Sequence, residues 1–234
     1  MNRYQENDRT SYSLGMSLTI ELLKQHPEKV REILLSEKAV KNSQLDLLMN
    51  LCRNNGITPV YDDRMIEKLS VKENCYCIGV FDKYSEKAEK GNHLVLYGFN
   101  DFGELGTVLR TAVSFDFKDI ILIRSNLDHF DPRCIRASMG SFFHCRISSY
   151  PDLSAYLKEY PSRHLFPFVS ESDNELSDLV LEEPYSLMIS QEYCGLDDRK
   201  EEGYYMDHKK QKEISLSVRS SIILAHAYYL NLKR

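Results

Sequence analysis

The fold is decided by residues 100–123, which read N-D-F-G-E-L-G-T-V-L-R-T-A-V-S-F-D-F-K-D-I-I-L-I. An apolar strand expected at residues 93–98 leads into this stretch, and a loop with two glycines then precedes a helix that we expect to begin near Leu105. A second apolar strand at residues 119–123 completes a βαβ unit. Open α/β sheets bind ligands at the carboxyl ends of their strands. The glycine loop, with Arg110 on the first turns of the helix beside it, is therefore a candidate site.

Strands and helices continue to alternate to the end of the chain, which predicts a mostly parallel sheet covered on both faces. Pro167 lies inside one predicted strand and indicates an edge position or a bulge. The further strands are expected at residues 144–150, 164–170 and 185–190, and the helices at 131–140, 152–160, 174–179 and 215–232.

The first third of the chain reads as a small α/β module, with residues 1–12 disordered or loosely attached. Residues 27–35 carry apolar residues at helical spacing, although 32–36 could equally form a short strand. The remaining helices are expected at residues 17–25, 45–52 and 62–69, and the strands at 57–61 and 75–81. The charged stretch 83–92 is the best linker. We therefore expect two domains, residues 1–88 and 92–234.

Composition is that of an ordinary globular protein: 42% hydrophobic and 28% charged residues in 234, with a net charge of −5. No apolar run approaches the roughly 20 residues that span a bilayer, and the polar first ten residues lack a signal-peptide core. The six cysteines form no CxxC pair or zinc-ligand spacing, so we expect reduced, packed thiols, no metal site and a reducing cytoplasm. A negative net charge gives no overall footprint for nucleic acid. The basic candidates are residues 24–31, Arg133, Arg136 and residues 209–212.

Three loops could carry chemistry, at residues 100–110, 190–196 and 206–217. Each is weak alone, since a glycine pair often marks only a tight turn, Glu192 could be an ordinary exposed carboxylate, and Ser215 could simply cap the last helix. A backbone loop at a helix start can also approach a phosphate or nucleoside. The order and spacing of the three loops are more specific than any one of them.

In combination they resemble the SpoU/TrmH family of RNA ribose 2′-O-methyltransferases, within the SPOUT superfamily. The family's first motif, Asp-Pro-x-Asn-x-Gly-x-x-x-Arg-x-Ala, corresponds to D-F-G-E-L-G-T-V-L-R-T-A at residues 101–112. Its second, Gly-x-Glu-Gly-x-Gly-Leu, corresponds to S-Q-E-Y-C-G-L at residues 190–196. Its third, Pro-Met, a glycine-containing loop and Ser-Leu-Asn-Val, corresponds to Y-M-D-H-K-K-Q-K-E-I-S-L-S-V at residues 205–218.

Several motif positions depart from the family pattern. Glu104 replaces the first motif's asparagine, Ser190 and Tyr193 replace two glycines, and Ser217 replaces the asparagine of the third. The third loop is also longer, rich in lysine and without its glycine. A carboxylate at Glu104 would disfavour an anionic substrate unless it paired with Arg110.

The resemblance implies a trefoil-knotted α/β domain that dimerises and transfers a methyl group from S-adenosylmethionine to a ribose 2′-oxygen of tRNA or rRNA. Arg110 would accept or stabilise charge as the hydroxyl loses its proton, with Glu192 and Ser215 orienting it and Glu104 nearby. The implied cofactor-binding residues are Ile189, Ser190, Gly195, Leu196, Met206 and Leu216. The N-terminal domain resembles the family's small RNA substrate-binding domain.

Two alternatives stand beside this interpretation. A diverged family member could bind RNA or a protein partner without methylating it. A dinucleotide enzyme would need G-x-G-x-x-G, and G-E-L-G lacks that spacing.

Overall fold

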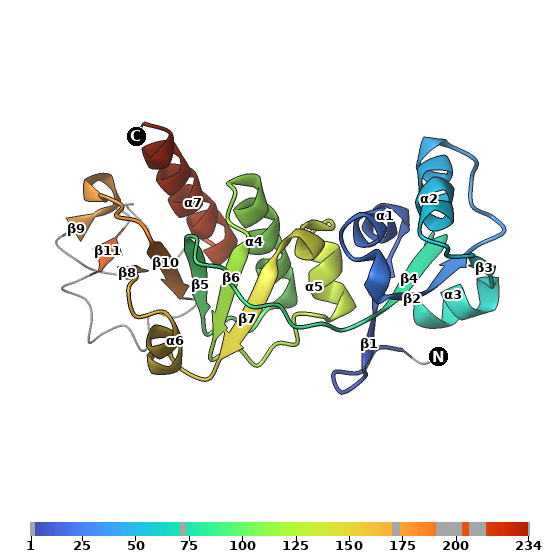
Figure 1. Ribbon diagram of the computed structural model, residues 1–234, viewed down its shortest axis with the longest axis horizontal. Coiled ribbons are helices and arrows are strands. Elements are labelled where there is room, and N and C mark those ends of the chain that lie inside the picture. Colours follow the sequence, from blue (N-terminus) through green and yellow to red (C-terminus); the bar gives the residue numbers. More distant parts are fainter. Residues whose placement is uncertain (1–2, 71–73, 170–173, 191–202, 206–213, 234) are drawn as a thin grey trace. The chain divides into compact units, whose positions relative to one another are not determined.

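A computed structural model describes residues 3–70, 74–169, 174–190, 203–205 and 214–233 (Figure 1). The chain divides into two compact units, which we call unit 1 and unit 2. Unit 1 comprises residues 1–84 and 128–144, and unit 2 comprises residues 85–127 and 145–234. The sequence prediction of domains at 1–88 and 92–234 did not anticipate that residues 128–144 pack with the first unit.

Unit 1 is built on a four-stranded sheet in the order β1-β4-β2-β3. Its strands are β1 (Thr10–Leu14), β2 (Val30–Leu35), β3 (Val60–Tyr61) and β4 (Cys77–Asp82). β1 pairs antiparallel with β4 from Thr10↔Asp82 to Leu14↔Ile78. The expectation that residues 1–12 are loosely attached is therefore wrong for its last residues, because Tyr12 is buried in this edge strand.

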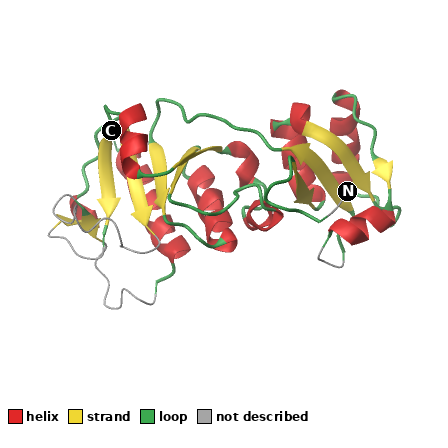
Figure 2. Cartoon of the chain, turned by 90° about the horizontal axis from the view of Figure 1, so that it is seen from below, coloured by secondary structure: helices red, strands yellow, loops and turns green. Residues whose placement is uncertain are grey.

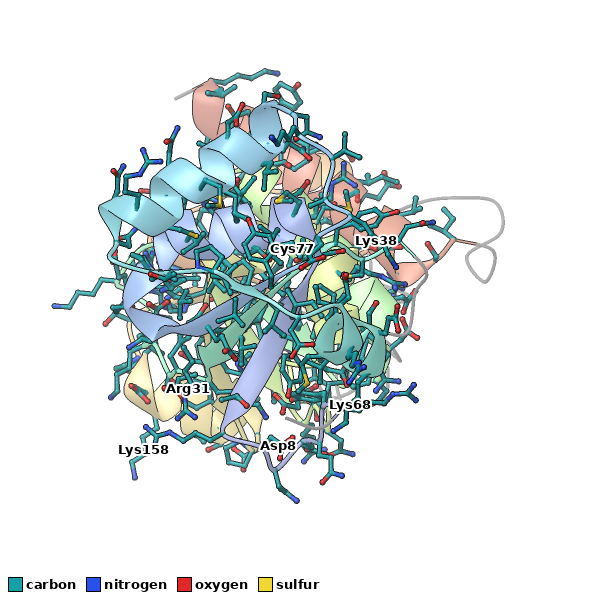
Figure 3. All side chains as sticks on the ribbon, turned by 90° about the vertical axis from the view of Figure 1, so that its right-hand side faces the viewer. Asp8, Arg31, Lys38, Lys68, Cys77 and Lys158 are labelled. Carbon is teal, nitrogen blue, oxygen red and sulfur yellow. The ribbon has the colours of Figure 1, made fainter. Side chains whose placement is uncertain are left out.

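Three helices cover the two faces of this sheet. α1 (Met16–Gln25) and α2 (Ser43–Asn54) pack on one face, and α3 (Asp63–Leu69) packs on the other. Figure 3 shows Cys77 inside this unit and Lys38 and Lys68 toward its periphery. Asn42 caps α2, since its side chain accepts hydrogen bonds from the N–H groups of residues 44 and 45.

Of the two alternatives considered for this stretch, the helix over residues 27–35 is not formed and the strand considered at residues 32–36 is observed. Pro27–Lys29 makes one 3₁₀ turn, η1, and the chain then enters β2. Ile33, Leu34 and Leu35 are all buried because β2 lies inside the sheet with helices on both faces. A strand covered on both faces reads as a continuous apolar run, which periodicity alone does not separate from a helix.

Residues 128–144 complete unit 1. They contain α5 (Pro132–Ala137), which contacts β1, and η2 (Ser141–His144). Three aromatic side chains anchor this segment: Phe143 contacts Phe81 of β4 with ring centroids 5.5 Å apart, and Phe130 lies 5.3 Å from Phe142. The segment leaves unit 2 after β6 and returns to it before β7.

Unit 2 contains a seven-stranded sheet in the order β7-β6-β5-β10-β8-β11-β9, and its strand pairs are parallel. Its strands are β5 (His93–Tyr97), β6 (Asp119–Ile123), β7 (Arg146–Tyr150), β8 (His164–Phe168), β9 (Asn174–Glu175), β10 (Tyr185–Ser190) and β11 (Tyr204–Tyr205). The predicted α/β class with a mostly parallel sheet is confirmed. The trefoil knot stays a prediction.

Helices lie on both faces of this sheet. α4 (Phe102–Ser114) and α7 (Leu216–Leu232) pack side by side, and α6 (Leu153–Glu159) covers the other face (Figures 1 and 2). Where a helix was expected at residues 174–179, the chain forms β9 and a 3₁₀ turn, η3 (Leu176–Asp178). Pro167 is not on an edge strand. Among the described residues, β11 pairs with β8 only at Phe168, so the proline disturbs no described ladder on that side.

The predicted linker has no regular secondary structure, yet its second half is fixed to unit 2. The Ala88 side chain is 8% exposed, and the Ala88 carbonyl accepts a hydrogen bond from Tyr160 Oη at 3.0 Å. The Ser148 hydroxyl donates to the carbonyl of Glu86 at 3.0 Å. The stretch therefore behaves as part of unit 2 from residue 85 onward.

His93 sits fully buried at the start of β5 in a closed hydrogen-bond network. Its Nε2 lies 2.7 Å from the Glu89 carbonyl, so Nε2 carries the proton and donates it. Its Nδ1 accepts from Tyr156 Oη at 2.9 Å, and that oxygen lies 2.6 Å from Ser186 Oγ. Burial lowers the pKa of His93 to about 4, which keeps the imidazole neutral.

The cysteines of the described residues are free thiols, as predicted. Cys52, Cys77, Cys134 and Cys145 are buried, and Cys75 is half-buried. Burial raises the pKa of Cys77 and of Cys145 to about 12, so these thiols are packing groups and not nucleophiles. Cys194 lies outside the described residues.

Candidate functional site

The described parts of the three motif segments, residues 100–110, Ser190 and residues 214–217, lie around one edge of the sheet of unit 2. β5 pairs in parallel with β10 on one side, with Tyr97 opposite Ser190, and with β6 on the other, with Tyr97 opposite Ile123. The carboxyl ends of all three strands therefore lie together. Gly98 turns the chain out of β5 with φ 71°, a conformation that glycine adopts without strain, and its N–H donates to the Ile123 carbonyl at 2.8 Å.

α4 begins earlier than expected, at Phe102 instead of near Leu105. Asp101 caps it, because its carboxylate accepts a hydrogen bond from the Glu104 N–H at 2.7 Å. Both glycines of G-E-L-G are consequently inside the helix and do not form a loop. The segment open to a ligand is the short turn at residues 98–101.

Arg110 and Glu104 do not meet. Among the ion pairs of the described residues, none joins these two side chains. They stand six positions apart on one helix, about 9 Å along the axis and on different faces. The pairing that the sequence left open is therefore not formed, in agreement with the helix geometry.

Arg110 also lies farther from the sheet edge than expected. It is exposed on the third turn of α4, about 12 Å along the axis from Phe102 at 1.5 Å per residue. The neighbouring Thr111 hydroxyl is 3.4 Å from Ser221 Oγ of α7. Arg110 thus belongs to the outer side of the α4–α7 layer.

Ser215 caps α7 with its hydroxyl, which accepts from the Val218 N–H at 3.4 Å. The side chain is exposed and also contacts Ser217 Oγ at 3.1 Å. The capping function considered from the sequence is therefore observed. Capping does not exclude a second function of Ser215 at the site.

Arg219, which sequence reasoning did not single out, joins the second and third motifs. Its guanidinium Nη2 donates to the Ser190 carbonyl at 2.9 Å. Ser190 ends β10 and Arg219 lies on the first turns of α7, so this bond holds the strand end against the helix start. The only signal in the sequence is that Arg219 directly follows S-L-S-V.

The predicted cofactor-binding residues are partly within the described structure. Ile189 and Ser190 are each 1% exposed at the end of β10, and Leu216 is 5% exposed at the start of α7. These residues are brought together at the carboxyl edge. Glu192, Gly195, Leu196 and Met206 lie outside the described residues.

Arg124 adds an unpredicted cation to this edge. It follows β6 with φ 49°, and its guanidinium carbon lies 5.7 Å from the centre of the Tyr97 ring. The next residue, Ser125, donates to the Phe99 carbonyl at 3.0 Å and fixes the turn. Arg124 is exposed, so its charge is available to an anion near the ends of β5 and β6.

The other predicted basic residues are elsewhere. Arg133 and Arg136 belong to α5 of unit 1, and residues 209–212 lie outside the described chain. Within the described residues, no group of His, Cys, Asp and Glu is arranged to hold a metal ion. In the same residues, no helix is both long and apolar enough to cross a membrane.

Comparison with known proteins agrees with this geometry. The model of the SpoU rRNA Methylase family matches residues 91–205. YacO of Bacillus subtilis (strain 168), assigned to the TrmH family of tRNA/rRNA methyltransferases, is 22% identical over 200 residues, or 79% of this chain and 80% of YacO. A ribosomal RNA small subunit methyltransferase G 2 of Syntrophobacter fumaroxidans is 30% identical over 84 residues, but the chain covers only 17% of it.

Solved structures share the fold. The SpoU methyltransferase AviRb from Streptomyces viridochromogenes, in complex with the cofactor AdoMet, has a TM-score of 0.80 at 14% identity, covering 97% of this chain and 92% of AviRb. An rRNA methyltransferase from Sinorhizobium meliloti has a TM-score of 0.75 at 18% identity, covering 94% and 87%. An RNA 2′-O ribose methyltransferase has a TM-score of 0.76 at 18% identity, covering 96% and 90%. From the family match and these relatives, we conclude that the chain belongs to the SpoU/TrmH family of RNA methyltransferases.

Proposed function

We propose that the protein transfers a methyl group from S-adenosylmethionine to a ribose 2′-hydroxyl of tRNA or rRNA. The observation that carries this proposal is the meeting of the described ends of the motif segments at one carboxyl edge. Tyr97 at the end of β5 lies opposite Ser190 at the end of β10, and Arg219 bonds Ser190 to the start of α7. Among proteins of similar fold, AviRb was solved with AdoMet, and another is named as an RNA 2′-O ribose methyltransferase.

The described residues fit a cofactor at this edge. Serine in place of a motif glycine could narrow the pocket, but Ser190 is 1% exposed and its side chain is packed inside the protein. Ile189 and Leu216 supply apolar surface from β10 and α7. We infer that these three residues, with Gly195, Leu196 and Met206, would hold the adenosine part of the cofactor, which supplies the methyl group on a sulfonium.

The residues of this chain would have to promote loss of the 2′-hydroxyl proton and stabilise the negative charge that forms on the oxygen. A ribose hydroxyl must lose its proton as its oxygen attacks the methyl carbon, and the oxygen gains negative charge. We assign the stabilisation of that charge to the Arg110 guanidinium, and the proton passes to the adjacent substrate phosphate or to water. Arg124 at the end of β6 would hold an adjacent phosphate. Glu192 and Ser215 would position these groups.

The position of Glu104 in the helix reduces the unfavourable effect that its carboxylate would have on an anionic substrate. It lies in the first turn of α4, where a carboxylate is stabilised by the positive end of the helix dipole. Its charge is thus partly compensated without Arg110. The substitution of the family's asparagine therefore leaves Arg110 available for the reaction.

A homodimer is part of the proposal, because α7 carries apolar residues on two faces. Its buried face packs in unit 2, while Val218, Ile222, Tyr229 and Leu232 are 51%, 40%, 60% and 63% exposed. These positions follow helical spacing and form one stripe. A second copy packed on this stripe would cover it and would also lie beside Arg110 on α4. Since Arg110 lies about 12 Å along α4 from the helix start, we infer that it would act in the site of the second copy.

Unit 1 is proposed to bind the RNA substrate, and the free buried cysteines fit a reducing cytoplasm. A second candidate function is a family member that binds RNA without methylating it. This alternative predicts that the substituted motifs no longer accept the cofactor.

Calorimetry with S-adenosylmethionine and S-adenosylhomocysteine separates the two. We expect saturable binding in the micromolar range, followed by methyl transfer to bulk tRNA or rRNA fragments. Absence of heat at millimolar ligand, together with retained RNA binding, would refute the enzyme and leave the binding protein.

A further inference from the structure

Unit 1 contains a pocket of about 500 Å³ that lies outside the methyltransferase site. It is formed by the N-terminal segment, β1, the end of α3 and α5, all within one unit. Its apolar wall includes Tyr12, Leu14 and Leu69, and its rim includes Arg3, Arg133 and Arg136. This volume is in the range of small-molecule sites.

The rim has an excess of positive charge. Three arginines face one acidic residue of the lining, Asp131. Asp131 caps α5 and accepts two hydrogen bonds from the Arg133 side chain, from Nε at 3.0 Å and Nη2 at 2.8 Å. That fork holds Arg133 in place and neutralises it. The charges of Arg3 and Arg136, both exposed, therefore remain for a ligand.

Arg3 has one hydrogen bond to the end of α3. Its Nε donates to the carbonyl of Lys68 at 3.3 Å, which leaves the terminal nitrogens of the guanidinium to other partners. Lys68 itself projects from the same unit (Figure 3). The two exposed arginines approach the pocket from different segments, the N-terminus and α5.

We propose that this pocket holds one unstacked nucleotide of the RNA, with its base against the apolar wall and its phosphate on Arg3 and Arg136. This proposal depends on the proposed RNA partner and specifies where the RNA binds. Planar guanidinium groups bind phosphate in a two-pronged fashion, and single-stranded RNA is recognised by inserting bases against aromatic and apolar surfaces. In a chain with a net charge of −5, a local excess of cationic groups beside an apolar pocket fits a ligand with both chemistries.

The test measures binding of an eight-nucleotide single-stranded RNA containing 4-thiouridine to the full chain at two salt concentrations. Relative to the wild type, the Arg3→Ala/Arg136→Ala double variant is expected to bind about tenfold more weakly at low salt, and its salt dependence should be shallower by roughly one ion. The matched control is Arg53→Ala, which removes an exposed arginine from α2. Photocrosslinks should map to residues 3–14 or to α5.

Three results would overturn the proposal. If the double variant binds as the wild type does and crosslinks map only to unit 2, the pocket is wrong while RNA remains the partner. If the wild type shows no salt-sensitive RNA binding, the RNA partner itself fails and the pocket with it. If dodecanoate, an amphiphilic anion without a base, competes for the pocket while uridine monophosphate does not, the occupant is not a nucleotide.

Discussion

His93 should make the stability of unit 2 depend on pH. In the folded chain its pKa is about 4 because the ring is buried, whereas an unfolded histidine has a pKa of about 6.5. Between these values the unfolded state binds more protons than the folded state, so stability falls as the pH falls. The contribution of the neutral ring is complete above pH 6.5 and is lost progressively down to about pH 4.

The size of the effect follows from the two pKa values. At pH 5 the unfolded histidine is almost fully protonated and the folded one almost fully neutral, which costs about 2 kcal/mol relative to pH 7.5. Protonating Nδ1 would also remove the acceptor for Tyr156 Oη. No exposed histidine should show a change of this size.

The assay is urea unfolding at pH 7.5 and pH 5, comparing the wild type with His93→Gln and His164→Gln. Glutamine at residue 93 keeps a hydrogen-bond donor and an acceptor but does not titrate. Between pH 7.5 and pH 5, the free energy of unfolding of this variant should therefore fall by about 2 kcal/mol less than that of the wild type. His164 lies on the surface and serves as the control. Equal pH dependence in the wild type and in His93→Gln would refute the reasoning.

Three further predictions concern the site. Arg110→Ala should lower the methyl-transfer rate by about a hundredfold or more, while calorimetry gives an unchanged affinity for S-adenosylmethionine; loss of both would make Arg110 structural. Tyr229→Glu should convert a dimer to a monomer in analytical ultracentrifugation, whereas Val180→Glu, at another exposed apolar residue, should not; a monomeric wild type contradicts the dimer. Ser215→Ala should lower the free energy of unfolding by about 1 kcal/mol, against no loss in Ser114→Ala, because only Ser215 caps a helix.

The parallel sheet of unit 2 could be predicted because its central strands have a clear local sequence pattern. Asp119–Ile123 and Tyr185–Ser190 are observed with the bounds expected, since each is a short run of buried apolar residues between polar turns. The capping function of Ser215 was also predicted, because a serine stands directly before the last helix. The cap of α4 by Asp101 was missed, because the helix was expected to begin near Leu105.

Other features could not be read because they depend on tertiary contacts. Nothing local distinguishes β2 from a helix, since its burial on both faces comes from elements distant in sequence. The hydrogen bond from Arg219 to Ser190 joins residues 29 positions apart, and no spacing rule reports it. Whether Glu104 pairs with Arg110 was left open by the sequence, because the helix was expected to begin near Leu105 and the faces of the two side chains were therefore unknown.

The assignment of residues 128–144 to unit 1 has a consequence for how such a gene could be rearranged. The chain passes between the two units three times, after residues 84, 127 and 144. A fragment starting at residue 92 would retain Phe130, Phe142 and Phe143 but lose Phe81 and Tyr84, against which they pack. Unit 1 therefore cannot be gained, lost or replaced by a single splice at the linker. Recombination that exchanged the first 88 residues would have to preserve an aromatic interface encoded 40 residues downstream of the join.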